Sequence, residues 1–199
     1  MDKDWSGNSR SVFATLGARN FAQEEREKND YYATEPKATR LLLDVERFSP
    51  YVWEPACGEG HMARVLEEYG YKVYASDLID RGYGHVLDFL SCDCPPLEQM
   101  ADIVTNPPYK YAKEFVEHAM DLLPDGAKCA MFLKLQFLEG KARRIMFEKY
   151  PPKVVYVSSA RLHCAINGDF DKIMHKNCIS FAWFVWEKGF KGEPIIRWI

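Results

Sequence analysis

The sequence predicts an α/β fold: a mostly parallel sheet of seven strands, helices on both faces, and an antiparallel hairpin at the C-terminal edge. Short apolar runs alternate with amphipathic segments between residues 51 and 149, which is the pattern of successive strand–helix units. The last two apolar runs, 153–157 and 177–187, have no helical segment between them, so we expect them to pair antiparallel. A stiff Asn106-Pro107-Pro108-Tyr109 loop follows another run, and open α/β sheets place their chemistry at such strand ends.

Length and composition limit the protein classes. The 199 residues, 47% hydrophobic and 28% charged, suit one globular domain with a proper core. No apolar run approaches the ~20 residues of a membrane span. The N-terminus lacks the apolar segment of a signal peptide, so we expect a cytoplasmic location. The net charge of −3 argues against a broadly basic surface for nucleic acid but allows a local basic groove. The six cysteines show no paired spacing and are expected to be free thiols.

The chain divides into an arm and a domain. Residues 1–30 are polar and mixed in charge, and we expect a frayed arm there rather than a DNA-binding one. Residues 31–199 form the single expected domain, with 158–176 as a loop inserted between the last two strands. Thr34 is the expected N-cap of a helix with Pro36 at its second position. Further strands are expected at 51–54, 72–77, 86–90, 102–105 and 127–135, and helices at 61–69, 111–123 and 140–149.

A glycine loop joins the strand at 51–54 to the next helix, with the sequence Glu54-Pro55-Ala56-Cys57-Gly58-Glu59-Gly60. Glycine there permits a tight turn and close approach of the backbone to a ligand. Asp77 ends the next strand, where a carboxylate accepts hydrogen bonds from both ribose hydroxyls of a nucleoside. The loop lacks the third glycine of a dinucleotide fingerprint, which disfavours a dinucleotide. It also lacks the Lys-Ser/Thr of a nucleoside-triphosphate loop, which excludes that class.

The diproline loop offers two fixed acceptors and an aromatic ring. Proline fixes φ, so the Asn106 amide oxygen and the Pro107 carbonyl are held in place beside Tyr109. These groups suit a planar substrate that carries an NH2 group. Two acceptors on its hydrogens localise the nitrogen lone pair as a bond to an electrophile forms, and this stabilises the transition state. The alternative is a plain proline turn, which would be favoured if the tetrapeptide stood alone.

Taken together, the glycine loop, the Asp-Ile-Val-Thr strand and Asn-Pro-Pro-Tyr resemble the S-adenosylmethionine (SAM)-dependent DNA adenine N6 methyltransferases, especially small phage- or prophage-borne members. The resemblance covers about Tyr31 to the C-terminus. It implies a Rossmann-like methyltransferase fold, SAM as the cofactor and DNA as the partner. It also implies methyl transfer to a flipped adenine without a metal. Asn106, Pro107, Pro108 and Tyr109 are then catalytic, with Tyr109 as the stacking platform.

The same resemblance implies the cofactor residues. An aromatic-Thr-Pro segment closes over the cofactor in this family, which assigns Tyr32 and Thr34. Glu54 would face the ammonium group, Asp88 would accept from the adenine amino group, and Phe89 would pack on the adenine face. For Asp88, a solvent-exposed acid at a strand end is the alternative. The full expected set is Tyr32, Thr34, Glu54, Pro55, Ala56, Cys57, Gly58, Gly60, Asp77, Leu78, Asp88, Phe89 and Asn106.

Basic and polar residues downstream are candidates for contact with nucleic acid. They are Lys134, Gln136, Lys141, Arg143, Arg144 and Arg161. For the three on the helix at 140–149, a solvated helix face is an equal alternative. Four further residues could in principle hold zinc, but their spacing fits no common pattern, so we expect no metal: His163, Cys164, His175 and Cys178.

Specificity and substrate stay open at this stage. No target-recognition domain of ordinary size is visible, so specificity is relaxed, is read by 158–176, or needs a partner or homodimer. The same diproline loop serves methylation of cytosine N4, RNA guanine N2 or protein glutamine. A non-catalytic SAM-binding regulatory subunit is a further alternative, and the intact loop at 106–109 argues against it.

Overall fold

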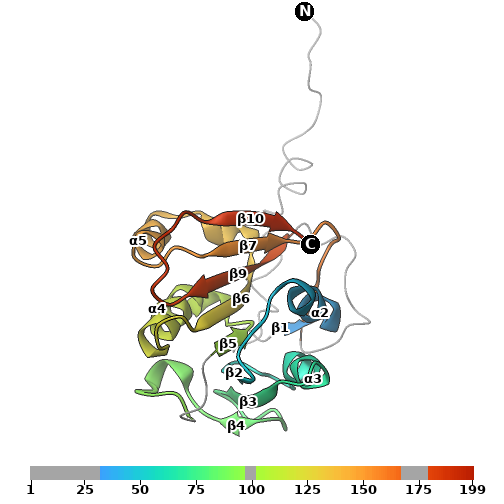
Figure 1. Cartoon of the computed structure of the whole chain (residues 1–199). Helices are drawn as coiled ribbons and strands as arrows, with labels where there is room; N and C mark the ends of the chain where they lie inside the picture. Colours follow the sequence, from blue (N-terminus) through green and yellow to red (C-terminus); the bar gives the residue numbers. More distant parts are fainter. Residues whose placement is uncertain (1–31, 97–101, 167–178) are drawn as a thin grey trace, which may run out of the picture.

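The computed structural model describes residues 32–96, 102–166 and 179–199. The expected arm at 1–30 and most of the inserted loop lie outside the described residues. One sheet forms the middle layer, with α2 and α3 on one face and α4 and α5 on the other (Figure 1). The helices are α2 (Pro36–Val45), α3 (His61–Glu68), α4 (Ala112–Leu122) and α5 (Lys141–Lys149). Among the described helices, none is long and apolar enough to cross a membrane.

The described sheet has eight strands, and all but one are parallel. Their order is β10 (Ile195–Trp198), β7 (Val154–Val157), β9 (Phe181–Glu187), β6 (Lys128–Lys134), β5 (Asp102–Thr105), β2 (Tyr51–Glu54), β3 (Lys72–Asp77) and β4 (His85–Val86). β9 runs antiparallel to both neighbours, which confirms the predicted antiparallel pairing. The chain winds outward in both directions from β2 and β5, and ligands of open α/β sheets bind at this switch point.

Three short 3₁₀ helices and a second, small sheet complete the described elements. The 3₁₀ helices are η1 (Phe89–Ser91), η2 (Tyr109–Tyr111) and η3 (Leu135–Leu138). β1 (Tyr32–Thr34) pairs antiparallel with β8 (Cys164–Ile166), and we call this two-stranded sheet the ribbon. The sequence did not predict the ribbon, because each of its strands has only three residues and each lies in a segment assigned to another element or to a loop.

The structure corrects the predicted sheet edges. The predicted seven strands are one too few, because β10 pairs parallel with β7 and forms the edge in place of the hairpin. All four residues of β10 are exposed, so the strand carries no burial pattern that sequence reasoning could detect. The strand predicted at 86–90 is reduced to His85–Val86. It stops there because the Asp88 carboxylate accepts from Leu90 N at 3.1 Å and Ser91 Oγ at 2.7 Å, which starts η1.

The start of α2 is also corrected. Thr34 lies in β1 and is not the N-cap; Glu35 occupies that position, with Pro36 as the first helical residue. The helix predicted at 61–69 ends one residue earlier, at Glu68; Met62, Val65 and Leu66 are buried, whereas Tyr69 after it is 42% exposed.

Large side chains of β9 fix the sheet between its helices. Phe184 and Trp186 pack on the α4 and α5 side, and Trp183 packs on the α2 and α3 side. Both indole N–H groups have acceptors: Trp183 Nε1 donates to Ala38 O at 2.8 Å and Trp186 Nε1 donates to Tyr150 O at 3.0 Å. Each such side chain contributes about 1.5–3 kcal/mol by burial. This packing holds the neighbouring strand ends in fixed positions.

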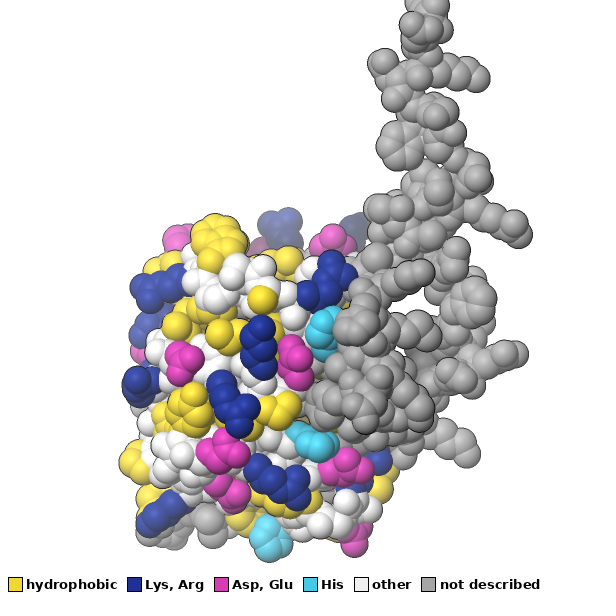
Figure 2. Space-filling model, turned by 90° about the vertical axis from the view of Figure 1, so that its right-hand side faces the viewer, with side chains coloured by type: hydrophobic (Ala, Val, Ile, Leu, Met, Phe, Trp, Pro, Cys, Tyr) yellow, Lys and Arg dark blue, Asp and Glu magenta, His cyan; other side chains and the backbone are white. Residues whose placement is uncertain are grey.

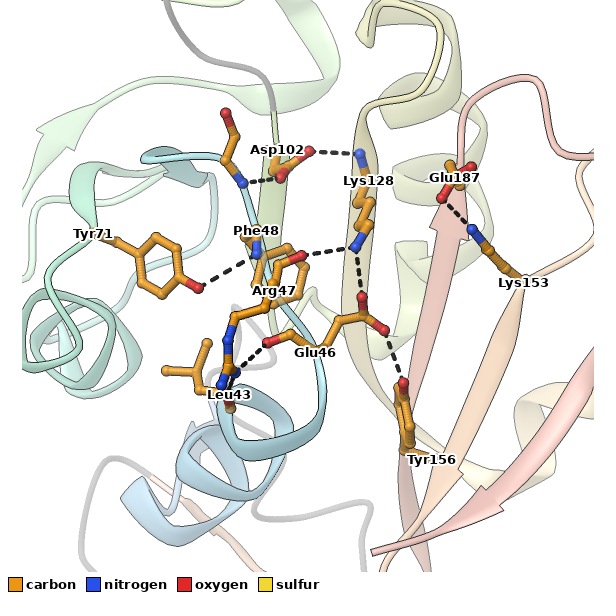
Figure 3. A network of polar contacts seen from close by, with 11 residues as sticks. Leu43, Glu46, Arg47, Phe48, Tyr71, Asp102, Lys128, Lys153, Tyr156 and Glu187 are labelled. Carbon is orange, nitrogen blue, oxygen red and sulfur yellow. Dashed lines mark hydrogen bonds and ion pairs between the residues drawn. The ribbon is translucent and has the colours of Figure 1, made fainter.

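A network of charged groups closes the edge where the parallel strands begin, which we call the amino edge (Figure 3). Asp102 accepts from the backbone N–H of Ser49 and of Lys128. Lys128 Nζ donates to Glu46 Oε1 at 2.6 Å, and Tyr156 OH donates to Glu46 Oε2 at 2.8 Å. Burial, with Glu46 nearby, raises the pKa of Tyr156 to about 12. Both oxygens of both carboxylates therefore have donors.

Candidate functional site

The ribbon covers the opposite edge of the sheet, the carboxyl edge, where β2 and β5 end. Its register pairs Thr34 with Cys164. Glu35 and His163 extend it: Glu35 N donates to His163 O at 3.3 Å, and His163 N donates to Glu35 Oε1 at 3.0 Å. The ribbon therefore joins the segment before α2 to the segment after β7, next to the diproline loop at 106–109.

A small cavity lies between the ribbon and the strand ends. It measures about 10 Å³, which is room for about one water molecule. Its lining residues are Tyr32, Ala33, Thr34, Glu54, Ala56, Cys57, His61, Met62 and Asn106. Six of these were predicted from the sequence, and the fold brings them together. His61 and Met62 were missed, although their place in the first turn of the helix after the glycine loop could have indicated them.

Three of the lining side chains carry a buried polar atom without a hydrogen-bond partner in the described structure. These atoms are Thr34 Oγ1, Glu54 Oε2 and Asn106 Oδ1. An unpaired buried polar group costs about 1–3 kcal/mol, so three around one cavity require an explanation. Other atoms of this kind, such as Thr39 Oγ1 and His118 Nε2, do not line the cavity. The convergence of three acceptors indicates a binding site for a ligand that carries hydrogen-bond donors.

Glu54 is the charged group of this cavity. Burial raises its pKa well above the ordinary carboxyl range; a hydrogen bond from Ala63 N opposes the shift, and Asp77 and Glu67 add to it. The carboxyl therefore favours its neutral form until a cation lies beside it. Burial, with Glu54 and Asp77 nearby, also raises the pKa of Cys57 to about 12, so this thiol stays protonated at neutral pH.

Asp77 holds the glycine loop in place. Its two oxygens accept from Gly58 N at 2.8 Å and from Ile79 N at 3.0 Å, which leaves one lone pair on each for a ligand. Gly60 has φ +80°, and a Cβ there would lie 2.5 Å from the Tyr83 ring. Glycine at this position is thus required by Tyr83. Next to the loop, Pro55 is buried, and Leu78 after Asp77 is exposed.

Seven predicted cofactor residues do not line the cavity: Pro55, Gly58, Gly60, Asp77, Leu78, Asp88 and Phe89. For the last two, the structure shows another role. Asp88 is exposed and caps η1. Phe89 is 2% exposed and packs within the core, its ring centroid 5.1 Å from Trp53 and 4.7 Å from Phe115. The faces of this ring are therefore occupied by protein side chains.

The diproline loop is held by the ribbon. Asn106 Nδ2 donates to the Tyr32 carbonyl at 2.8 Å, and Pro107 after it is buried. The Tyr109 ring lies 5.8 Å from the Tyr32 ring and 5.9 Å from Phe181. Lys134 Nζ lies over the Tyr109 ring at 4.6 Å, which is cation–π distance. A base stacking on that face would have to displace Lys134.

The candidate residues for nucleic acid lie near this edge but differ in their surroundings. Gln136 lines an open cleft of about 240 Å³ beside Glu139. Arg143 lies 5.3 Å over the Phe137 ring, and Arg144 forms an ion pair with Glu148 at 2.9 Å. Lys141 and Arg161 are exposed. Basic and acidic side chains are interspersed on the face shown in Figure 2, in keeping with the net charge of −3.

Metal binding finds no support among the described residues. No group of three or more His, Cys, Asp or Glu side chains there lies close enough to hold an ion. His175 and Cys178, which were considered for zinc, lie outside the described residues.

Comparisons with known proteins identify the fold. No protein-family model matches the sequence, and no curated protein matches it significantly. Among solved structures, a protein described as a class I SAM-dependent methyltransferase from Listeria monocytogenes superposes with a TM-score of 0.58 at 11% identity, over 96% of this chain and 71% of that chain. A protein described as an RNA methyltransferase from Pyrococcus horikoshii superposes with a TM-score of 0.55 at 11% identity, over 93% of this chain and 100% of that chain.

A third match is a chain of a type I R-M system, with a TM-score of 0.50 and 16% identity, over 96% of this chain and 48% of that chain. At these identities the matches show the fold and nothing finer. The protein thus has the Rossmann-like fold of the class I SAM-dependent methyltransferases.

Proposed function

We propose that this protein transfers a methyl group from SAM to the exocyclic N6 amino group of a flipped adenine in DNA. The observation that carries the proposal is the state of Asn106. Its amide N–H is bound to the Tyr32 carbonyl, while its buried Oδ1 lacks a partner in the described structure. A preorganised acceptor of this kind suits an amine donor at the end of β5.

The cavity residues fit the cofactor. SAM, when bound, supplies an electrophilic methyl group on a sulfonium. Glu54 would hold its ammonium group, the Thr34 hydroxyl would bond to a neighbouring polar group, and Asp77 would accept from the ribose hydroxyls. Because the cavity holds about one water molecule, its walls must move apart to admit any larger ligand.

The chain's own groups then act on the target amine. Asn106 Oδ1 and the Pro107 carbonyl accept its two N–H bonds, which localises the nitrogen lone pair. Tyr109 offers a stacking face for the base once Lys134 has moved. The proton is lost to water after transfer, so no residue with a shifted pKa is needed as a base. Asn106 is the residue on which this chemistry depends.

DNA as the substrate is supported by three observations. The Asn-Pro-Pro-Tyr loop resembles that of the DNA adenine methyltransferases. Exposed Lys141 and Arg161 can contact phosphates near the site. One structural match belongs to a type I R-M system. The structural match described as an RNA methyltransferase favours a second candidate, the same chemistry on an amino group in RNA.

Mass spectrometry of nucleosides tests the assignment. The protein is incubated with SAM carrying a deuterated methyl group and with duplex DNA, single-stranded DNA or RNA, and the acceptors are digested. We expect labelled N6-methyladenine from DNA, and none with the Asn106→Ala variant. Label that appears only in RNA or protein would reject DNA as the substrate.

A further inference from the structure

Cys164 of the ribbon lies against two residues of the diproline loop, Asn106 and Tyr109. Its Sγ is 3.2 Å from the Tyr109 hydroxyl and 3.9 Å from Asn106 Nδ2. Cys164 is more than 50 residues away from both in the sequence, so the contact exists only because β8 pairs with β1. Through this thiol, β8 contacts both loop side chains.

The state of the thiol suits a hydrogen-bonding role. Burial raises the pKa of Cys164 to about 12, so it stays protonated at neutral pH and is a poor nucleophile. A protonated thiol can both donate and accept weak hydrogen bonds. It can therefore bridge the Tyr109 hydroxyl and the Asn106 amide at the same time.

The bridge bears on the orientation of the Asn106 amide. One N–H points to the Tyr32 carbonyl and the other to Cys164 Sγ, so both donors of Nδ2 face the ribbon. A flipped amide would place Oδ1 against the Tyr32 carbonyl oxygen, which is repulsive. The two ribbon contacts therefore keep Oδ1 on the side of the cavity, where no described residue bonds to it.

We infer that Cys164 is a positioning residue for methyl transfer: its thiol, together with the Tyr32 carbonyl, holds Asn106 Oδ1 and the Tyr109 ring in the geometry that receives the target amine. This inference rests on the proposed function, because it names a further determinant of the same site. It makes catalysis depend on the closed ribbon, since opening of β8 withdraws the thiol from the loop.

The test compares Cys164→Ala with Cys164→Ser, with Cys94→Ser as the control because Cys94 is exposed and does not line the cavity. For Cys164→Ala we expect kcat to fall about tenfold, the effect of one lost hydrogen bond in a transition state. The Kd for SAM should change less than about twofold because the thiol does not line the cavity. The serine hydroxyl should restore most of kcat, and the control should match the wild type.

A second readout does not depend on activity. The side-chain NH2 signals of Asn106, identified by their loss in Asn106→Ala, are followed by ¹⁵N–¹H NMR. They should shift in Cys164→Ala and stay near their wild-type positions in the control.

The outcomes separate the two proposals. Unchanged kcat and unchanged Asn106 signals in Cys164→Ala would overturn the positioning role. An equal loss of kcat, SAM affinity and melting temperature in both Cys164 variants would also overturn it, because that pattern indicates packing alone. If the wild-type protein forms no N6-methyladenine, the proposed function fails, and the Asn106 signals alone decide whether Cys164 positions the amide.

Discussion

The two edges of the sheet differ in whether their buried oxygen atoms have hydrogen-bond donors. At the amino edge, Asp102 and Glu46 each have donors for both oxygens. At the carboxyl edge, Glu54 is buried and Asn106 is half-buried, and the buried atoms Glu54 Oε2 and Asn106 Oδ1 have no partner in the described structure. Burial without partners costs free energy, so the contacts at the amino edge stabilise the fold, and the unpaired oxygens at the carboxyl edge lower its stability. Buried carboxylates of the same chemistry can therefore be sorted by their hydrogen bonds into structural and functional groups.

The largest expected effect is at Asn106. Asn106→Ala should lower kcat by on the order of 10³-fold, because it removes a preorganised acceptor for the amine. SAM affinity and the melting temperature should stay near wild type. Methylation assays at saturating substrate measure kcat, and calorimetry measures SAM affinity and the melting temperature. Full activity in this variant would remove Asn106 from the mechanism.

The next largest effect is at the amino edge. Asp102→Ala leaves the N–H groups of Ser49 and Lys128 without their acceptor. We expect a loss of about 2–4 kcal/mol in the free energy of unfolding, measured by urea denaturation. SAM affinity below the unfolding transition should not change. A loss of affinity without a loss of stability would contradict the structural role of this edge.

A matched pair of substitutions gives effects of opposite sign. Glu54→Gln should raise the free energy of unfolding at neutral pH by about 1 kcal/mol, because it removes a buried carboxyl with an unpaired oxygen. Glu46→Gln should lower it, because it weakens the contacts to Lys128 and Tyr156. Glu54→Gln should also weaken SAM binding about tenfold by removing the partner of the ammonium group. A lower free energy of unfolding in both variants would contradict the difference proposed between the two edges.

The pH dependence of the free energy of unfolding gives a second test of the Glu54→Gln prediction. Burial raises the pKa of Glu54, so the folded protein binds this proton more tightly than the unfolded chain does. Its contribution to stability is therefore full at pH values below the ordinary carboxyl pKa and is lost as the pH rises through the raised value. The stability advantage of Glu54→Gln over wild type should grow over the same range. Urea denaturation at several pH values measures it, and a difference independent of pH would contradict the shift.

The smallest expected effect concerns DNA. Lys141→Ala at the carboxyl edge should weaken DNA binding a few-fold and reduce the salt slope, log Kd against log [salt], by about 1. Lys72→Ala at the start of β3, on the amino edge, is the control and should leave both quantities unchanged. Fluorescence anisotropy titrations measure both quantities. Equal changes of Kd and salt slope in the two variants would contradict DNA binding at the carboxyl edge.

The fold could be predicted from the sequence wherever burial left a pattern. β2, β3 and β5 begin and end at the predicted residues: β2 and β5 are largely buried runs, and β3 has its buried residues next to the Asp77 strand end. β10 could not be predicted, because its residues are exposed. The ribbon could not either, because it depends on pairing between segments more than 120 residues apart.

The candidate site was predictable in part for the same reason. Glu54 and Asn106 follow from local motifs at strand ends, and the fold brings them to one cavity. Phe89 was expected at the cofactor, yet its side chain faces Trp53 and Phe115, and a dipeptide motif does not specify the direction of a ring. Cys164 carries no motif at all, and only the pairing of β8 with β1 reveals its place.

The most direct test of the contrast between the edges is an experimental structure of the protein with SAM bound. The account predicts that Glu54 Oε2 and Thr34 Oγ1 gain hydrogen bonds to the cofactor. It also predicts that Asn106 Oδ1 faces the methyl group, while the contacts of Asp102 and Glu46 stay as they are. A cofactor bound away from this cavity, or Asn106 Oδ1 turned away from it, would contradict the account.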